Sequence, residues 1–174
     1  MSPTAYGLQP FKVIVVEDQK TKEELQKFSQ NQTQITEASH ILVFAIVKDI
    51  SQSYFDEYMK LVAETRHIPI EALVSYKHMV MSSIESNGPI NNRATNQAYL
   101  VFWFLLMAAA QMNIDVCPIE MFDTKEYNSI LHLDKQGLSA VVMCAIGYRD
   151  PADQNAHFKK IRRPMNDIVW YFSA

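Results

Sequence analysis

Hydrophobic and polar positions alternate along this chain in blocks that predict helices packed on a small sheet. Short runs rich in β-branched and other apolar residues predict strands over residues 12–16 (KVIVV), 41–47 (ILVFAIV) and 139–148 (SAVVMCAIGY). Residues 116–119 form a fourth, shorter extended piece that carries a proline. The run over 41–47 contains no polar residue, so we expect a strand that is covered on both faces.

Helical spacing of apolar residues occupies most of the sequence between these strands. It predicts helices over residues 21–30, 31–38, 53–66, 70–84, 92–113 and 123–131. Thr21 and Glu24 have the spacing of a capping box, Pro69 is placed to open a helix, and Asp123 is a candidate N-cap. The apolar run over residues 98–110 is too short to span a bilayer, and it predicts a fully buried helix.

The end of the sequence has a different character. Residues 151–163 are polar and basic and predict a loop, whereas residues 168–172 (IVWYF) are apolar. A terminal tail this apolar must dock either on its own sheet or on a partner chain. The length of 174 residues favours a single domain over residues 1–174. Because strands and helices alternate, we expect the α/β or α+β class with one main sheet.

Composition and charge exclude several classes of protein. A formal net charge of -3 argues against a nucleic-acid partner, and only 4 glycines leave no glycine-rich phosphate loop. Cys117 and Cys144 each lie in an apolar run, so we expect two buried free thiols and a reducing compartment. The first ten residues do not form a signal peptide. These features predict a cytoplasmic protein with no membrane partner.

Metal and nucleophile chemistry receive little support from the histidines. No pair has a metal-binding spacing, and no GxSxG motif is present. We therefore interpret all five as surface or hydrogen-bonded polar residues: His40, His67, His78, His132 and His157.

Four segments carry residue types suited to a flat heterocycle with a phosphate. The sequence opens on SPTAYGLQPF directly before the first predicted strand. Asn31 and Gln34 are one helical turn apart, so both amides can face one site, and amides offer a donor and an acceptor to the edge of a ring. CPIEMFD follows the short extended piece. KKIRRP lies near the end, and lysine with arginine suits a phosphate.

In this order, these segments resemble the nitroreductase family of flavoproteins. The resemblance runs from Ser2 to about Val169 and rests on SPTAYGLQPF with VIVVED, NQTQI with EASHILVF, NQAYLVFWFLLMAAA with MNIDVCPIEMFD, AVVMCAIGY, and KIRRP. It implies a mostly antiparallel sheet flanked by helices, in an intertwined homodimer. It also implies an FMN held non-covalently between the subunits, with NADH or NADPH as the donor. The acceptor would be a nitroaromatic, a quinone or a similar small molecule, used by a ping-pong mechanism.

The resemblance also assigns roles by matched position. Tyr6 would stand near the nicotinamide or the acceptor, and no residue would act as acid, base or nucleophile. Asn31 and Gln34 would contact the pyrimidine edge, and residues 118–121 would offer a backbone N–H to N5. Lys160 and Arg162 would hold the phosphate. The full set implied to bind the cofactor is Pro3, Thr4, Ala5, Asn31, Gln34, Gln97, Pro118, Ile119, Glu120, Met121, Lys160 and Arg162.

Three departures from the family pattern bear on function. The family normally begins with a helix and a basic motif that help to hold the phosphate, and this sequence starts after them. A shortened sequence and a variant with weakened flavin affinity both fit that start. Met121 stands where relatives commonly have glycine, which predicts a narrower acceptor pocket. Gln34 stands where some relatives have lysine, which predicts a flavin that is harder to reduce.

Two other functions therefore stay open from the residues. One is a non-catalytic flavin-fold protein that acts in dimerisation or ligand binding, and the other is an α/β small-molecule binder without flavin. Uptake of FMN separates the enzyme from both alternatives.

Overall fold

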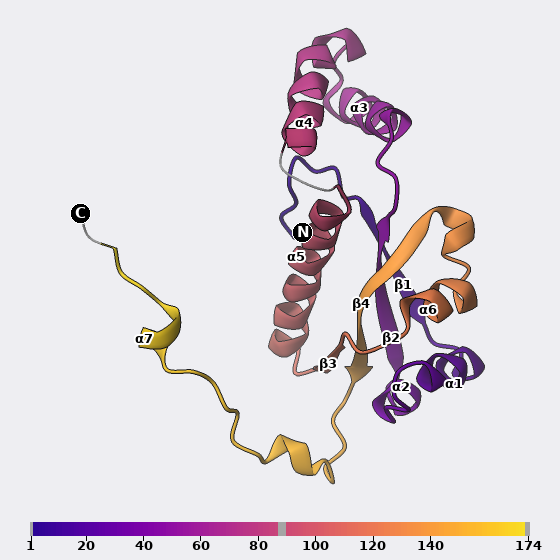
Figure 1. Ribbon diagram of the computed structural model, residues 1–174, viewed down its shortest axis with the longest axis vertical. Helices are drawn as coiled ribbons and strands as arrows, with labels where there is room; N and C mark the ends of the chain where they lie inside the picture. The colour runs from indigo at the N-terminus through magenta and orange to yellow at the C-terminus, as the bar shows by residue number, and fades with distance from the viewer. Residues whose placement is uncertain (1, 87–89, 173–174) are drawn as a thin grey trace.

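The fold is organised around one antiparallel sheet, seen in a computed structural model that describes residues 2–86 and 90–172 (Figure 1). The strands lie in the order β1-β2-β4-β3. Their bounds are Phe11–Val16 for β1, His40–Val47 for β2, Asp115–Ile119 for β3 and Leu138–Gly147 for β4. All three pairings are antiparallel, which confirms the predicted α+β class and the four predicted strands.

Strand β2 lies at the centre and is covered on both faces, as its unbroken apolar run predicts. Ile41 and Val43 belong to one buried cluster, whereas Phe44 and Ile46 belong to another. Successive residues of a strand point to opposite faces, so one strand serves two cores. A register shift between Phe44 and Ala45, opposite β4, adds a bulge to this central pairing.

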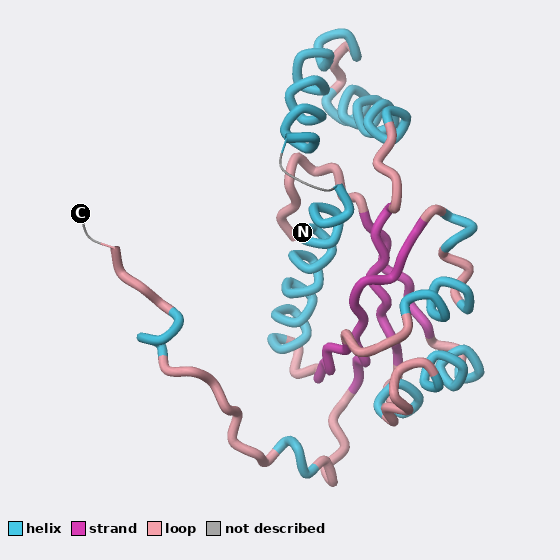
Figure 2. Tube along the Cα trace, viewed as in Figure 1, coloured by secondary structure: helices cyan, strands magenta, loops and turns pink. Residues whose placement is uncertain are grey.

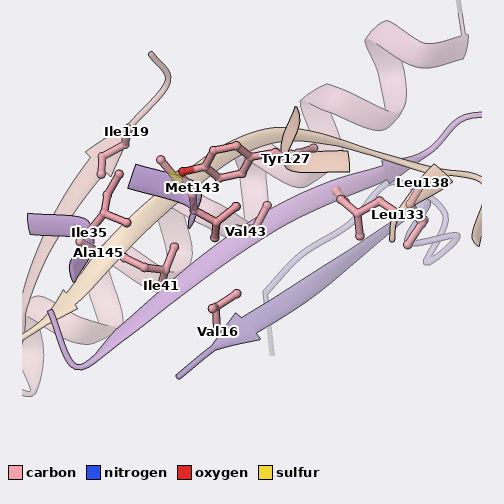
Figure 3. Close-up of a cluster of buried hydrophobic side chains, with 13 residues drawn as sticks. Val16, Ile35, Ile41, Val43, Ile119, Tyr127, Leu133, Leu138, Met143 and Ala145 are labelled. Atoms are coloured by element: carbon pink, nitrogen blue, oxygen red, sulfur yellow. The ribbon is translucent and has the colours of Figure 1, made fainter. Parts of the chain in front are cut away.

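Three short helices cover the first face: α1 (Gln19–Lys27), α2 (Gln34–Glu37) and α6 (Thr124–Ile130). Figure 3 shows the cluster that they enclose, with Tyr127 lying across Met143 and Val43. The Tyr127 hydroxyl meets the Ser29 hydroxyl at 2.5 Å, and burial raises the pKa of Tyr127 to about 12. The phenol is therefore a neutral hydrogen-bonding group inside this core.

The long helix α5 (Ile90–Gln111) covers the second face (Figure 1). Phe102 is 1% exposed and packs edge-on against Phe44, with ring centroids 5.2 Å apart. The prediction of a fully buried helix over residues 98–110 is wrong, because Trp103 is 58% and Met107 64% exposed. Only one side of α5 packs on the sheet. The apolar side chains on its other side are therefore exposed and available for another contact.

A helical pair continues beyond one end of the sheet. It consists of α3 (Gln52–Arg66), the 3-10 turn η1 (Ile70–Leu73) and α4 (Val74–Ser86), joined by a small cluster of Met59, Val62 and Leu73. Pro69 precedes η1 rather than the α-helix itself. A further 3-10 turn, η2 (Asp134–Gln136), leads into β4.

Residues 149–172 form an arm that leaves the body after β4 and extends away from it (Figures 1 and 2). The arm contains the 3-10 turn η3 (Gln154–Ala156) and the short helix α7 (Met165–Ile168). Trp170 is 86% exposed, and Tyr171 and Phe172 are also exposed. The apolar tail therefore does not dock on its own sheet.

The start of α1 differs from the predicted capping box. Asp18, and not Thr21, is the N-cap, and its carboxylate accepts hydrogen bonds from the N–H and the hydroxyl of Thr21, both at 2.8 Å. These bonds lower the pKa of Asp18. The helix begins two residues earlier than predicted because the Asp18 side chain, and not that of Thr21, caps its first turn.

Within the described parts of the chain, no helix is both long enough and apolar enough to cross a membrane.

Asn128 joins α6 to β4, and its loss should destabilise the fold. Its side chain is 5% exposed, accepts from the Ala140 N–H at 2.8 Å and donates to the Ser139 hydroxyl at 3.2 Å. Asn128→Ala leaves a buried N–H without an acceptor, so we expect the free energy of unfolding to fall by about 1–3 kcal/mol in urea denaturation. Ser129→Ala, on the exposed side of the same helix, is the matched control, and an equal loss in both variants would contradict this role.

Candidate functional site

The N-terminal segment is held against the start of α5. The Gln97 side-chain oxygen accepts a hydrogen bond from the Ala5 N–H at 2.6 Å. The following residues turn sharply, with φ of 57° at Tyr6 and 76° at Gly7. A Cβ at Gly7 would lie 2.8 Å from the Tyr58 hydroxyl, so glycine is required there both for its backbone angle and for space. The turn leaves Pro3 and Ala5 exposed beside Gln97.

Two tyrosines of α3 fix this segment, and the sequence analysis missed them. The Tyr58 hydroxyl donates to the Tyr6 carbonyl, and the Tyr54 hydroxyl donates to the Leu8 and Gln9 carbonyls at 3.2 and 3.1 Å. Burial raises the pKa of both Tyr54 and Tyr58, so both stay protonated donors. The sequence feature that could have revealed these two tyrosines is their spacing of four residues, which places them on one face of a helix.

The Tyr6 side chain has its own support. Its hydroxyl lies 2.8 Å from the Ser83 hydroxyl of α4, so the ring is oriented by a residue 77 positions away. The predicted substrate residue and the predicted cofactor residue Ala5 therefore share one rigid turn.

A second group forms at α2, on the far side of the sheet from this turn. Gln34 is the first residue of α2, and its amide donates to the Gln32 side chain at 2.8 Å and contacts the Cys117 sulfur at 3.9 Å. Asn31 lies before the helix with φ of 53°, so the prediction that it shares a helical turn with Gln34 is wrong. Cys117 is exposed beside Gln34, which corrects the prediction of a buried thiol. Cys144 is buried as expected.

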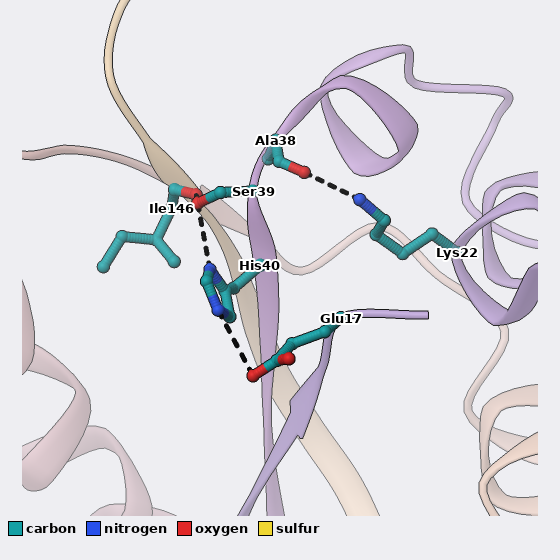
Figure 4. Close-up of polar contacts among 6 residues, drawn as sticks. All are labelled: Glu17, Lys22, Ala38, Ser39, His40 and Ile146. Carbon is teal, nitrogen blue, oxygen red and sulfur yellow. Dashed lines mark hydrogen bonds and ion pairs between the residues drawn. The ribbon is translucent and has the colours of Figure 1, made fainter. Parts of the chain in front are cut away.

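Lys22 secures α2 from behind. Its side chain is 5% exposed, and its ammonium donates to the Ala38 carbonyl at 2.8 Å (Figure 4). It also donates to the Thr36 carbonyl at 3.4 Å. A cation at the carbonyl end of a helix is favourable, because it satisfies carbonyls that have no helical partner. This buried lysine thus sets the position from which Gln34 projects.

A polar chain beside Lys22 ties the start of β2 to its neighbours (Figure 4). The Ser39 hydroxyl donates to the Ile146 carbonyl at 2.7 Å, and His40 lies 3.0 Å from that hydroxyl and 3.3 Å from the Glu17 carboxylate. Because the Ser39 proton is engaged with a carbonyl, this Ser–His–Glu series is a structural brace and not a nucleophilic triad.

A cavity of about 580 Å³ opens between this second group and α5. Amides, three aromatic rings and the segment after β3 line it. Its lining residues are Gln30, Gln32, Tyr99, Phe102, Trp103 and residues 118–121. A volume of several hundred Å³ with mixed apolar and amide walls suits a planar ligand of cofactor size.

The segment after β3 presents backbone to this cavity. The Phe122 N–H donates to the Glu120 carbonyl at 3.1 Å, which turns the chain at Met121. Among the described residues, none accepts from the Met121 N–H. Ile119 is 3% exposed and belongs to the core, so its side chain supports the segment from beneath. Met121 is 61% exposed and its side chain borders the cavity.

Tyr99 of α5 supplies a contact that the sequence analysis also missed. Its hydroxyl donates to the Glu120 carboxylate at 2.6 Å. The tyrosine was hidden inside an apolar helical run, and only the packing of α5 beside β3 brings the two side chains together.

The first group (Ala5, Tyr6 and Gln97) and the second group (Gln34, Glu120 and Met121) lie on different sides of α5. Gln97 and Tyr99 are two residues apart on this helix, so their side chains point about 160° apart. Figure 1 shows the N-terminal segment beside the first turns of α5 and β3 beside its last turns. One chain therefore holds two groups of candidate site residues, called half-sites below, that face away from each other.

Lys160 and Arg162 join neither half-site within one chain. Both lie on the exposed arm, which runs away from the body (Figure 1). Within the described residues, neither side chain forms an ion pair, and Arg162 donates only to the Ile161 carbonyl. Their charges are available to a group outside this chain.

A sequence model described as the nitroreductase family matches residues 1–148. The chain belongs to the nitroreductase family.

Several members of the family are similar over nearly the whole chain. YfkO of Bacillus subtilis is 30% identical over 184 residues, which cover 97% of this chain and 80% of that protein. The major NAD(P)H-flavin oxidoreductase of Aliivibrio fischeri is 28% identical over 179 residues, with 97% and 82% covered. The crystal structure of ydfN from Bacillus subtilis superposes with a TM-score of 0.79 at 25% identity, covering 99% of this chain and 82% of that chain.

A nitroreductase structure from Exiguobacterium sibiricum in complex with FMN has the same fold. Its TM-score is 0.78 at 18% identity, and the match covers 98% of this chain and 80% of that chain. The family match ends where the arm of this chain begins, so the body carries the family signature.

Gln97 should control the order of the N-terminal half-site. Gln97→Ala removes the acceptor of the Ala5 N–H, so we expect amide hydrogen exchange at Ala5 to accelerate by about tenfold, the equivalent of a hydrogen bond worth about 1.4 kcal/mol. Gln97→Glu retains an acceptor oxygen and is the matched control. Unchanged exchange in Gln97→Ala would show that the segment is held by the tyrosines alone.

Proposed function

We propose that two copies of this chain bind FMN at their interface and transfer electrons from NADH or NADPH to a small acceptor. The observation that carries this proposal is the pair of half-sites facing away from each other across α5. In a two-fold dimer, the N-terminal half-site of one subunit meets the α2–β3 half-site of the other. The exposed side of α5 and the apolar arm supply the surfaces that such a dimer needs.

Family membership supports the activity. The chain is an FMN-dependent NAD(P)H oxidoreductase of the nitroreductase family, in keeping with the flavin oxidoreductase of Aliivibrio fischeri and the FMN complex from Exiguobacterium sibiricum. We propose nitroaromatics, quinones and similar electrophiles as acceptors, used in a ping-pong sequence because donor and acceptor share one open face of the ring.

The residues present fit FMN. The cavity beside β3 has the volume for a tricyclic ring, and a free Met121 N–H lies along it. Gln32 lines that space and accepts a hydrogen bond from the Gln34 amide, so this pair offers amide donors and acceptors beside it. Lys160 and Arg162 form no ion pair within the described residues and supply two cations for a phosphate. These two side chains could bind the phosphate without a glycine-rich loop.

The chain itself binds and orients. Bound FMN supplies the redox chemistry, accepting two electrons from the nicotinamide and passing them to the acceptor. Gln34 and Asn31 would hold the pyrimidine edge, and residues 118–121 would approach the central ring through the backbone. Pro3, Thr4 and Ala5 of the other subunit would cover the ring from across the interface. Tyr6, braced by Ser83, would border the space for donor and acceptor.

The alternative function is that of a non-catalytic flavin-fold protein, and the absorbance spectrum of the purified protein tests it. We expect the purified protein to be yellow, or to become so with added FMN, and to lose its flavin absorbance under anaerobic NADPH or NADH. A protein that binds FMN but is not bleached by either donor would be a binding protein and not an enzyme.

The phosphate contact can be tested apart from the ring contacts. Lys160→Ala and Arg162→Ala should each weaken FMN binding by about tenfold, because each removes one charge-assisted contact to the phosphate. Binding of riboflavin, which lacks the phosphate, should not change. Fluorescence titration of the apoprotein measures both ligands.

Lys135→Ala is the control for this pair, since Lys135 is an exposed cation of η2 on the body of the chain. Equal losses for riboflavin and FMN would place Lys160 and Arg162 away from the phosphate.

A shared site predicts complementation between defective chains. Ala5→Trp blocks the N-terminal half-site and Gln34→Trp blocks the α2–β3 half-site, and both positions reach solvent, so the fold should tolerate them. Each variant alone should lose FMN. After mixed refolding, about a quarter of the sites should recover FMN, because half of the dimers are mixed and each mixed dimer has one intact site.

No recovery in the mixture, with dimers confirmed by light scattering, would show that each site is built within one chain. A stable monomer of the unaltered protein would contradict the shared site directly.

A further inference from the structure

We propose that the Glu120 carboxylate, held in place by the Tyr99 hydroxyl, makes this site select neutral and cationic aromatic acceptors over anionic ones. The inference rests on the proposed function, because it concerns which molecules enter the cavity beside the bound ring. It assigns Glu120 the discriminating charge and makes Tyr99 a positioning residue that acts through Glu120.

The position of Tyr99 is set by the core. Its ring packs edge-on against Phe102, with centroids 6.1 Å apart, and Phe102 in turn packs on Phe44 of the central strand. Tyr99 projects from this stack to donate to Glu120 at 2.6 Å. A side chain at the surface of the cavity is thus connected through two rings to the middle of the sheet.

Tyr99 is a donor over the whole working range of pH. Burial, and then the hydrogen bond and charge of Glu120, raise the pKa of Tyr99 to about 12. The phenol keeps its proton, so the Glu120 oxygen that it contacts always has a donor. Among the described residues, the second carboxylate oxygen has no hydrogen-bond partner, and it is left for the cavity.

Among the described residues that line this cavity, Glu120 is the only one with a charged side chain. Its neighbours are amides, aromatic rings, a proline, an isoleucine and a methionine. Trp103 is an exposed ring in the cavity wall and favours flat apolar molecules, so the walls accept an aromatic acceptor whatever its charge. Discrimination by charge therefore falls to one carboxylate.

The expected size of the effect follows from Coulomb's law. A unit charge about 5 Å from a carboxylate in a partly solvated cleft should change affinity by about tenfold in each direction. An anion is disfavoured and a cation favoured relative to a neutral ring of the same shape. Added salt should reduce both differences, because the cleft is open to solvent.

Binding without turnover tests this directly. The probes are benzoate, benzyl alcohol and benzyltrimethylammonium, titrated by calorimetry into the FMN-loaded protein in the absence of NADPH. We expect dissociation constants in the order cation, neutral, anion, with about a hundredfold between the two ends, the product of the two tenfold steps. The same order should appear in kcat/KM for 4-nitrobenzyltrimethylammonium, 4-nitrobenzyl alcohol and 4-nitrobenzoate.

Three variants identify the source of the preference. Glu120→Gln keeps the shape and removes the charge, so the cation-to-anion ratio should fall to near one. Tyr99→Phe keeps the ring and releases the carboxylate, so the ratio should fall to an intermediate value while the neutral probe binds as before. Glu64→Gln removes an exposed carboxylate of α3, away from the cavity, and should retain the full ratio.

The outcomes separate the two proposals. Protein that binds no FMN overturns the proposed function, and this inference with it. Protein that binds FMN but shows the same ratio with and without the Glu120 charge overturns the inference alone. A full ratio in Tyr99→Phe overturns the positioning role of Tyr99. A loss of affinity for all three probes in Tyr99→Phe also counts against it, because a structural defect would not depend on the charge of the probe.

Discussion

Phe102 of α5 packs against Phe44 of β2, and the rest of the site depends on this contact. It orients α5 by burying one side of the helix in the sheet. The orientation places Gln97 toward the N-terminal segment and Tyr99 toward Glu120. Both half-sites are therefore positioned by the same helix, and a rotation of α5 would displace both of them.

Functional positions in this protein are held mainly by hydrogen bonds from residues outside the site. Lys22 supports α2 through its last carbonyls, and Tyr58 supports the N-terminal turn through the Tyr6 carbonyl. Such supports rigidify exposed segments that have little core of their own. Burying polar groups costs free energy unless they form hydrogen bonds. Here every buried side-chain polar atom in the described residues has a hydrogen-bond partner.

The surfaces left apolar are the ones that a partner subunit would use. Met107 projects from α5, and Trp170 extends from an arm that touches no core of its own. The arm also carries Lys160 and Arg162, so one segment would combine the proposed apolar contact and the proposed contacts to the phosphate. Dimer formation and FMN binding are thus expected to be coupled, since ordering the arm serves both.

Sequence patterns alone determined the four strands, the main helices and the family, because local periodicity and motif order do not depend on long-range contacts. They also placed Gln34 and residues 118–121 near one site. They failed where distant parts of the chain decide: Cys117 is exposed beside Gln34, Asn31 lies outside the helix, and α5 is buried on one side only. The Tyr99–Glu120 bond and the opposite orientation of the half-sites were decided by tertiary structure. Both arise from how α5 packs on the sheet, and an apolar run does not encode which of its sides meets the core.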